Sequence, residues 1–231
     1  MASAWNTPGL HYGFHESLVA GTGVRFCREA RFLTPHERNL VVVCSTTVDV
    51  YRLAGDADAP SLVLAASFEL HGVVTGCDVG RIPGNVRDCL FLAFKDAKCS
   101  VVEYSPSNHD LVSVSMHAYE DDEMRGGRVS GSRGPLVRVD PEGRCAGMLV
   151  YGRKMVVLPL GKVEGGGAAD RQPEHRSADR LRSYTIDLAA LEPRMAHVVD
   201  FAWLPGFYEP TLMILHESVP AWAGCVPDWI S

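Results

Sequence analysis

The stretch from Asp88 to His117 constrains the fold more than any other part of the chain. It consists of an apolar run, a charged turn, a second apolar run, a turn with proline and asparagine, and an alternating run. Leu90–Phe94 is apolar throughout, which is typical of an inner strand covered on both faces. Val112–His117 alternates between apolar and polar residues, which is typical of a half-exposed outer strand. The stretch therefore predicts a three-stranded antiparallel meander.

The same strand–turn–strand unit occurs four times along the chain. Its copies begin at Asn39, Asp88, Cys145 and Thr211, which lie 49, 57 and 66 residues apart. Repeats of about 40–50 residues, each a strand–turn–strand unit, are the signature of β-propeller blades, and longer intervals indicate insertions in loops. We therefore predict an all-β fold: a partial β-propeller of about three to four antiparallel blades that form an open arc.

The fourth repeat is incomplete, which is why we expect the arc to stay open. After the apolar run at 211–216, Pro220 and Pro227 interrupt the position of the partner strand and remove donors from a strand ladder. Blades bury their faces on one another, so each terminal blade would expose an apolar face. The chain is therefore expected to be marginally stable and prone to associate.

The remaining strands and loops follow from shorter signals. Unbroken apolar runs around Leu92 and Val157 place both residues in inner strands buried on both faces. Gly161–Arg182 is rich in glycine and charge and is predicted to be a flexible surface insertion. No long amphipathic helix is expected. Further strands are predicted at 24–26, 62–70, 73–80, 136–139, 183–188, 196–204 and 211–216.

The composition is that of an ordinary soluble globular domain. The 231 residues are 46% hydrophobic and 22% charged, and no apolar run approaches the roughly 20 residues that span a bilayer. The N-terminus, Met1–Leu10, has no basic region and no apolar core, so no signal peptide is predicted and an intracellular location is expected. The net charge of −6 is a poor match for a phosphate backbone and argues against strong autonomous nucleic-acid binding.

The sequence contains no motif of nucleotide binding, nucleophilic catalysis or metal binding. There is no glycine-rich phosphate loop and no Gly-x-Ser-x-Gly elbow. His71, His109 and His117 stand singly and are interpreted as turn or surface residues. The seven cysteines include no Cys-x-x-Cys pair, and most lie in apolar runs, so buried reduced thiols are expected. We predict no enzyme, no cofactor and no small-molecule substrate.

Two charged groups in and just after the long polar connection Ala118–Gly134 are candidate binding sites. Glu120–Glu123 lacks the spacing of a calcium loop, so a solvated acidic loop is the simpler interpretation. A strip of arginines is a candidate RNA contact, although no aromatic residues are interleaved for base stacking, and a solvated loop is the alternative. These arginines are Arg125, Arg128, Arg133 and Arg138.

Three aromatic residues near one turn are candidate partner contacts: Trp203, Phe207 and Tyr208. Aromatic side chains dominate the binding energy of many protein interfaces. The alternative is that they pack in the core between two blades.

Eight strings in and between these strands are distinctive: Glu37–Val42, Val50–Leu53, Leu64–Phe68, Phe94–Lys98, Ser100–Tyr104, Val137–Ala146, Met148–Gly152 and Tyr208–Leu212. Together they resemble the N-terminal region of the large subunit of the cleavage and polyadenylation specificity factor. The resemblance covers residues 37–217, whereas residues 1–36 match poorly and residues 218–231 form a divergent tail.

The resemblance implies a role as well as a fold. The family is similar in architecture to the large subunit of the damaged-DNA-binding protein, with three β-propellers and a helical C-terminal domain. Its members are nuclear, non-enzymatic scaffolds of pre-mRNA 3′-end processing. They hold a WD-repeat subunit and a zinc-finger subunit that recognise the polyadenylation signal, and a role in binding pre-mRNA has been assigned to the large subunit itself. The expected function is therefore a scaffold fragment, and the alternative is direct RNA binding through the loop Arg125–Arg138.

Overall fold

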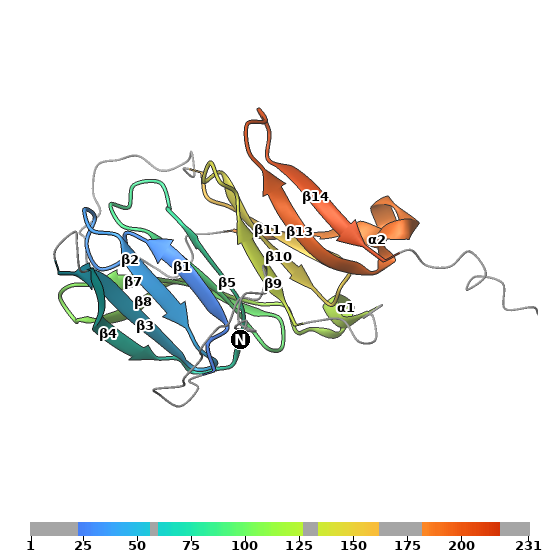
Figure 1. The fold of residues 1–231 in the computed structure, drawn as a ribbon. Helices are drawn as coiled ribbons and strands as arrows, with labels where there is room; N and C mark the ends of the chain where they lie inside the picture. The colour runs from blue at the N-terminus through green and yellow to red at the C-terminus, as the bar shows by residue number, and fades with distance from the viewer. Residues whose placement is uncertain (1–22, 56–59, 127–133, 162–181, 218–231) are drawn as a thin grey trace, which may run out of the picture.

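The computed structural model describes residues 23–55, 60–126, 134–161 and 182–217. These residues form three four-stranded antiparallel sheets and one two-stranded hairpin. In each sheet the strands pair in chain order, and the sheets follow one another from the first sheet to the C-terminal hairpin (Figure 1). The predicted all-β fold, an open arc of propeller blades, is confirmed.

The strands lie close to the predicted positions. The first sheet contains β1 (Phe26–Ala30), β2 (Asn39–Val43), β3 (Thr47–Ala54) and β4 (Ser61–Glu69). The second sheet contains β5 (Val74–Gly80), β6 (Cys89–Phe94), β7 (Lys98–Ser105) and β8 (Asp110–Ala118). The third sheet contains β9 (Leu136–Val139), β10 (Cys145–Val150), β11 (Lys154–Pro159) and β12 (Tyr184–Asp187). The C-terminal hairpin contains β13 (Val198–Leu204) and β14 (Thr211–His216).

The predicted meander is the main part of the second sheet. Strands β6, β7 and β8 pair as expected, and β5 pairs with β6 as the first strand of the sheet. Leu92 in β6 is fully buried and Val157 in β11 is nearly so, which confirms the prediction that both strands are covered on both faces. Two covered faces explain why these strands are apolar without alternation.

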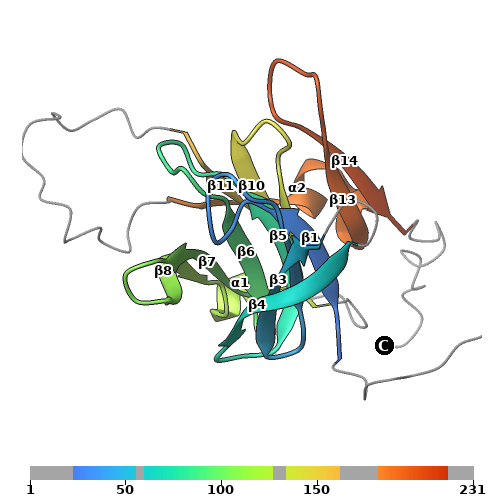
Figure 2. The same cartoon turned by 60° about the vertical axis from the view of Figure 1, so that its left-hand side comes forward.

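Three apolar cores lie between consecutive sheets. The first joins Val41 and Val50 to Leu92, and so packs the first sheet on the second. The second joins Phe91 to Met148, across the second and third sheets. The third packs the C-terminal hairpin on the third sheet. Each middle sheet is therefore buried on two sides, whereas among the described residues nothing packs on the outer side of the first sheet or of the C-terminal hairpin (Figure 2).

Glycines on β5 allow the inner strands of neighbouring sheets to approach each other. A Cβ atom at Gly80 would lie 2.5 Å from Cγ1 of Val139 in β9, and one at Gly76 would lie 3.0 Å from the carbonyl oxygen of Pro135. Asp78, between them, accepts a hydrogen bond from the backbone nitrogen of Val139 (2.7 Å) and one from Arg28 Nε (3.1 Å). This carboxylate links all three sheets at their inner strands.

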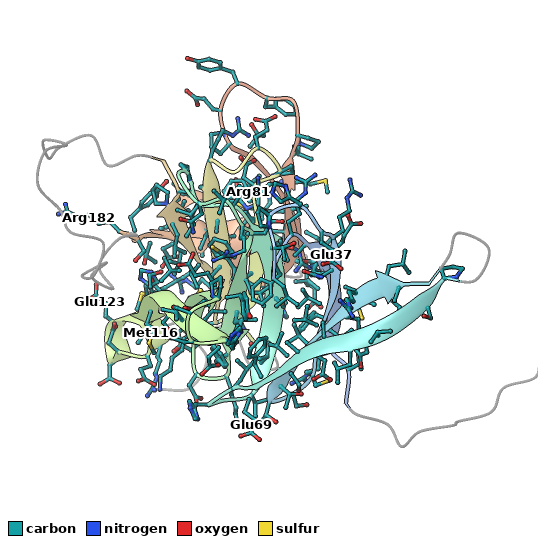
Figure 3. All side chains as sticks on the ribbon, turned by 90° about the vertical axis from the view of Figure 1, so that its left-hand side faces the viewer. Glu37, Glu69, Arg81, Met116, Glu123 and Arg182 are labelled. Carbon is teal, nitrogen blue, oxygen red and sulfur yellow. The ribbon has the colours of Figure 1, made fainter. Side chains whose placement is uncertain are left out.

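The outer strand β8 is half-exposed, as predicted, but its methionine faces solvent. A register shift between Val101 and Val102 places Ser115 opposite Val101, on the face covered by the third sheet. Ser115 is therefore fully buried, whereas Met116 is 70% exposed at the outside of the sheet (Figure 3). The alternation in the sequence does not reveal such a bulge, since a one-residue insertion reverses the face of every later residue.

Some predicted boundaries differ from the structure. The strand expected at 24–26 is β1, and the two ranges share only Phe26. The strand expected at 183–188 ends at Asp187, because the Asp187 carboxylate accepts hydrogen bonds from the nitrogens of Ala189 and Ala190 and so starts a short helix. The helices of the described residues have four residues each: α1 (Asp122–Arg125), α2 (Leu188–Leu191) and the 3₁₀ helix η1 (Pro193–Ala196).

Several predictions concern residues outside the described ranges. The insertion predicted at Gly161–Arg182 has only its two end residues within them, and the tail at 218–231 lies outside altogether. Among the residues described, no helix has the length and apolar character to cross a membrane.

Candidate partner-binding surface

The turn between β13 and β14 projects beyond the neighbouring turns at one end of the blades (Figure 1). It carries two of the three aromatic residues predicted to contact a partner. Phe207 is 52% exposed and Tyr208 is 99% exposed. Two adjacent aromatic side chains that are exposed to solvent at the tip of a hairpin contribute little to packing within the fold. Such exposed aromatic pairs are typical of a binding surface.

Arg144 holds this turn in place. Its Nη1 atom donates hydrogen bonds to the carbonyl oxygens of Phe207 (2.6 Å) and Tyr208 (3.1 Å). The backbone nitrogen of Gly206 donates to Oε1 of Glu142 at 2.8 Å. The turn between β9 and β10 therefore fixes the backbone of the turn between β13 and β14, and we call these contacts the hairpin clamp.

Asp140 positions the arginine of the hairpin clamp. Arg144 Nε donates to Asp140 Oδ2 at 2.7 Å and Arg144 Nη2 donates to Asp140 Oδ1 at 2.9 Å. The Asp140 side chain is fully buried, and the guanidinium hydrogen bonds lower the pKa of its carboxyl group. A two-pronged pair of this kind fixes the plane of the guanidinium group. The remaining Nη1 donor is therefore aimed at the two carbonyl groups.

The third predicted aromatic residue has a structural role. Trp203 is buried between the hairpin and the third sheet, and its indole Nε1 donates to the carbonyl oxygen of Arg138 at 3.0 Å. A Cβ atom at Gly147 would lie 3.0 Å from the Trp203 ring, so the glycine makes room for it. Trp203 thus packs in the core, as the alternative interpretation expected, whereas Phe207 and Tyr208 remain candidate partner contacts.

The predicted arginine strip is only partly described. Arg128 and Arg133 lie outside the described residues. Arg125 is exposed at the end of α1, and a hydrogen bond with Tyr151 raises the pKa of its guanidinium group. Arg138 is half-buried in β9 and pairs with Asp200 Oδ1 at 3.3 Å. Within the fold, Arg125 therefore interacts with Tyr151 and Arg138 with Asp200.

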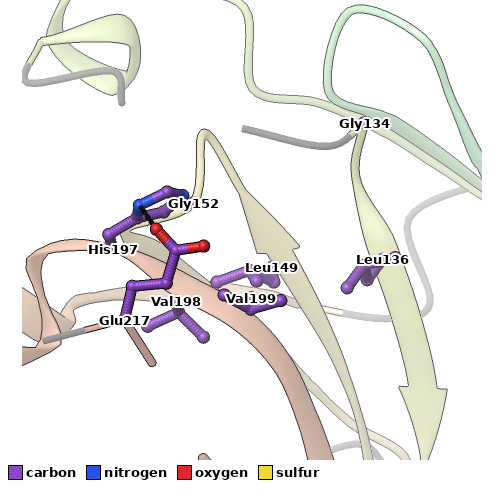
Figure 4. Close-up of a pocket in the computed structure, with 8 residues that line it drawn as sticks. All are labelled: Gly134, Leu136, Leu149, Gly152, His197, Val198, Val199 and Glu217. Carbon is purple, nitrogen blue, oxygen red and sulfur yellow. Dashed lines mark ion pairs between the residues drawn. The ribbon is translucent and has the colours of Figure 1, made fainter. Parts of the chain in front are cut away.

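A small pocket lies at the opposite end of the hairpin from the aromatic turn. It has a volume of about 100 Å³ and is lined by Gly134, Gly152 and the ion pair of His197 Nδ1 with Glu217 Oε2 at 2.9 Å (Figure 4). Pockets for cofactors and drug-sized ligands have roughly 300–1,000 Å³. This one has room for a few water molecules or the end of one side chain.

The other polar candidates are engaged in local structure. Asp121 caps α1 by accepting a hydrogen bond from the nitrogen of Met124 at 2.7 Å, and Glu120 pairs with Lys98. Within the described ranges no three His, Cys, Asp or Glu side chains gather as a metal site. Burial raises the pKa of the Cys77 and Cys99 thiols to about 12, so these sulfurs are protonated at neutral pH.

The family model described as "RSE1/DDB1/CPSF1 first beta-propeller" matches residues 23–219. The chain belongs to this family. The resemblance found in the sequence is confirmed. In this chain the hairpin clamp joins the third sheet to the C-terminal hairpin.

Named relatives of this propeller family are large proteins. The chain is 36% identical over 226 residues to cleavage and polyadenylation specificity factor subunit 1 of Drosophila melanogaster, covering 87% of this chain and 16% of the relative. It is 42% identical over 177 residues to the protein of the same name in Arabidopsis thaliana, covering 72% of this chain and 12% of the relative. The chain thus spans less than a fifth of the length of these relatives.

Sequence reasoning missed the residues that hold the aromatic turn. In the sequence, Asp140 and Arg144 stood out only as parts of Val137–Ala146, one of the strings of the family resemblance. Their spacing of four residues across a Pro-Glu-Gly turn allows the two side chains to meet. The acceptor carbonyls, more than 60 residues away, belong to another blade of the first propeller.

Proposed function

We propose that this chain is a non-enzymatic scaffold segment of pre-mRNA 3′-end processing that acts in the nucleus. The observation that carries the proposal is a pair of exposed aromatic side chains, Phe207 and Tyr208, on a turn with a fixed backbone in a chain of this propeller family. Its relatives are named subunits of a cleavage and polyadenylation specificity factor. A scaffold needs a rigid body and an exposed binding surface. The packed sheets supply the first, and the aromatic turn, whose backbone the hairpin clamp holds, supplies the second.

The partners proposed are the WD-repeat subunit and the zinc-finger subunit of the same factor, which recognise the polyadenylation signal. Aromatic side chains bind a protein surface well when their backbone is already ordered, because little conformational entropy is lost on binding. Arg144 and Glu142 order the backbone of the turn before any partner arrives. Truncation of such aromatics typically costs about 2 kcal/mol or more of binding free energy.

Direct RNA binding is the second candidate function. Arg125 is exposed and supports it, whereas Arg138 is engaged with Asp200 and the net charge of the chain is −6. Binding by arginines alone depends steeply on salt, since each phosphate contact releases counterions. The aromatic turn therefore favours the scaffold.

The test measures binding of the purified chain to the two purified subunits by isothermal titration calorimetry. The variant Phe207→Ser with Tyr208→Ser should weaken binding by at least roughly tenfold. Leu191→Ser is the matched control, because Leu191 is 69% exposed in α2, away from the aromatic turn. The control should bind like the wild-type chain.

Three results would count against the proposal. If the wild-type chain binds neither of the two subunits, the scaffold role is refuted. Equal binding by the aromatic double variant would refute the assignment of the surface. Binding of a single-stranded RNA alone at physiological salt, lost in Arg125→Ala, would favour the second candidate function.

A further inference from the structure

The turn between β7 and β8 carries a serine followed by proline. Strand β7 ends at Ser105, which is half-buried, and the residues between it and β8 are all exposed: Pro106, Ser107, Asn108 and His109. The second sheet is packed between the first and the third sheets. The exposure of this turn is therefore independent of what packs on the two ends of the arc.

A serine or threonine followed by proline is the recognition element of proline-directed protein kinases, which bind the substrate segment in an extended form. Ser105 continues the extended strand β7, and the segment after it lies in solvent. The Ser105 hydroxyl oxygen lies 2.9 Å from that of Ser107, so its hydrogen bond is confined to the exposed turn. The local structure thus suits a kinase substrate.

Two further dipeptides of this kind occur in the chain, Thr7-Pro8 and Thr34-Pro35. Thr7 lies outside the described residues. The Thr34 hydroxyl accepts a hydrogen bond from the nitrogen of Glu37 at 3.1 Å, and Phe32, two residues before Thr34, is fully buried. An extended form of that loop would have to pull Phe32 out of the core. Ser105 is therefore the better substrate of the two described candidates.

The pairing register brings an arginine to Ser105. Strands β6 and β7 pair Leu90 with Val102. Continued beyond the start of β6, this register places Arg87 opposite Ser105, and residues directly opposite in an antiparallel pair share one face of the sheet. Arg87 Nη2 donates to the carbonyl oxygen of Tyr104 at 3.0 Å. The guanidinium group therefore lies beside the peptide bond that joins Tyr104 to Ser105.

Most hydrogen-bond donors of Arg87 are unused. In the part of the chain that the structure describes, the bond to Tyr104 is its only hydrogen bond, it forms no ion pair, and its Nε atom is buried without a partner. A guanidinium group is a planar fork of N–H donors that matches the oxygen atoms of a phosphate. Arg87 is therefore equipped to bind a phosphate on Ser105.

The acidic neighbours of Ser105 favour the same direction. Strand β8 places Asp110 opposite Ser105 on the side away from Arg87. Glu103, on the same face of β7, accepts a hydrogen bond from Asn85 Nδ2 at 2.8 Å. Because carboxylates repel a phosphate and an arginine attracts it, a phosphate on Ser105 turns toward Arg87.

We propose that Ser105 is a phosphorylation site of a proline-directed protein kinase and that Arg87 binds the phosphate. Oγ of Ser105 attacks the γ-phosphorus of ATP, and the Oγ–P bond forms while the bond from phosphorus to the oxygen shared with the β-phosphate breaks. The hydroxyl proton passes to the catalytic carboxylate of the kinase, and ADP leaves. The phosphate adds a charge of about −1.5 to −2 opposite Arg87. The inference stands apart from the proposed scaffold role, which uses the aromatic turn.

The first measurement locates the phosphate. The purified chain is incubated with ATP, magnesium and a recombinant kinase of the cyclin-dependent class, and tandem mass spectrometry identifies the modified residue. We expect phosphate on Ser105, and no phosphate there in Ser105→Ala or Pro106→Ala. Ser113→Ala is the matched control, because Ser113 is exposed in β8 and no proline follows it. A synthetic peptide of residues 101–111 shows that the kinase is active.

The second measurement tests the role of Arg87. The second pKa of a phosphoserine is ordinarily about 6, and phosphorus NMR follows it during a pH titration. The phosphate of the wild-type chain should have a lower pKa than that of Arg87→Gln, because a nearby guanidinium group favours the dianion. Arg52→Gln, at an exposed arginine in β3, is the matched control and should titrate like the wild type.

Two kinds of result would overturn the inference. If the folded chain stays unmodified at Ser105 while the peptide is phosphorylated, or if phosphate is found only on Thr34 or other residues, Ser105 is not the site. If the phosphate has the same pKa in the wild-type chain and in Arg87→Gln, Arg87 does not bind it.

Discussion

Side chains in the middle strands of a sheet are enclosed by their own sheet and the sheet that they face, and Leu92 is the clearest case. It lies in β6, between Ser100 of β7 and Cys77 of β5, and the first sheet covers it. Met116 belongs to the same sheet but lies on its outer strand in solvent. The position of a residue in the blade, more than its residue type, therefore decides how much a substitution costs.

The change Leu92→Asp should lower the free energy of unfolding by about 4 kcal/mol or prevent folding, because it buries an unpaired carboxylate. The matched control Met116→Asp should change it by no more than about 0.5 kcal/mol. Urea unfolding followed by tryptophan fluorescence measures both. Equal stability of the two variants would be incompatible with the position of β6 between two sheets.

At the scale of the elements, turns carry the contacts that the sequence does not reveal. Strand positions were predictable, since apolar runs and alternation depend on local burial, and β14 was predicted at its observed bounds. The hairpin clamp was not, because Arg144 and its acceptor carbonyls at Phe207 and Tyr208 are far apart in the chain. Of the predicted site residues, Phe207 and Tyr208 are exposed together, whereas Trp203 belongs to the core.

The clamp should make stability depend on pH through Asp140. Its folded-state pKa lies below the ordinary value of 3.8, so its contribution is complete above that value and is lost as the pH falls through the lower folded pKa. Asp140→Asn should cost about 1.5–3 kcal/mol at pH 7, the usual loss for a hydrogen bond to a charged group. Thermal unfolding of the variant should depend less on pH below 5 than that of the wild type.

The control for this prediction is Asp122→Asn, because Asp122 is exposed in the first turn of α1. It should leave the pH dependence unchanged. If Asp140→Asn and the wild type lose stability in parallel as the pH falls, the Asp140 carboxylate does not contribute in the way the geometry indicates.

At the scale of the whole molecule, the arc is protected in its middle and open at its ends. Strand β10 is buried along its whole length, between β9 and β11 and between two neighbouring blades. Within the part of the chain that the structure describes, strand β14 pairs with β13 alone. The repeats in the sequence predicted this openness, because the fourth unit has one apolar run where the others have two. They did not reveal which faces meet, since that depends on the register of each strand.

Hydrogen–deuterium exchange on a dilute sample tests the open arc most directly. Amide protection depends on how often a segment opens, and segments with little burial open most easily. The account predicts the slowest exchange in β6 and β10, intermediate exchange in the first sheet, and fast exchange in β14. Protection of β14 equal to that of β10 would contradict a hairpin whose outer side is uncovered.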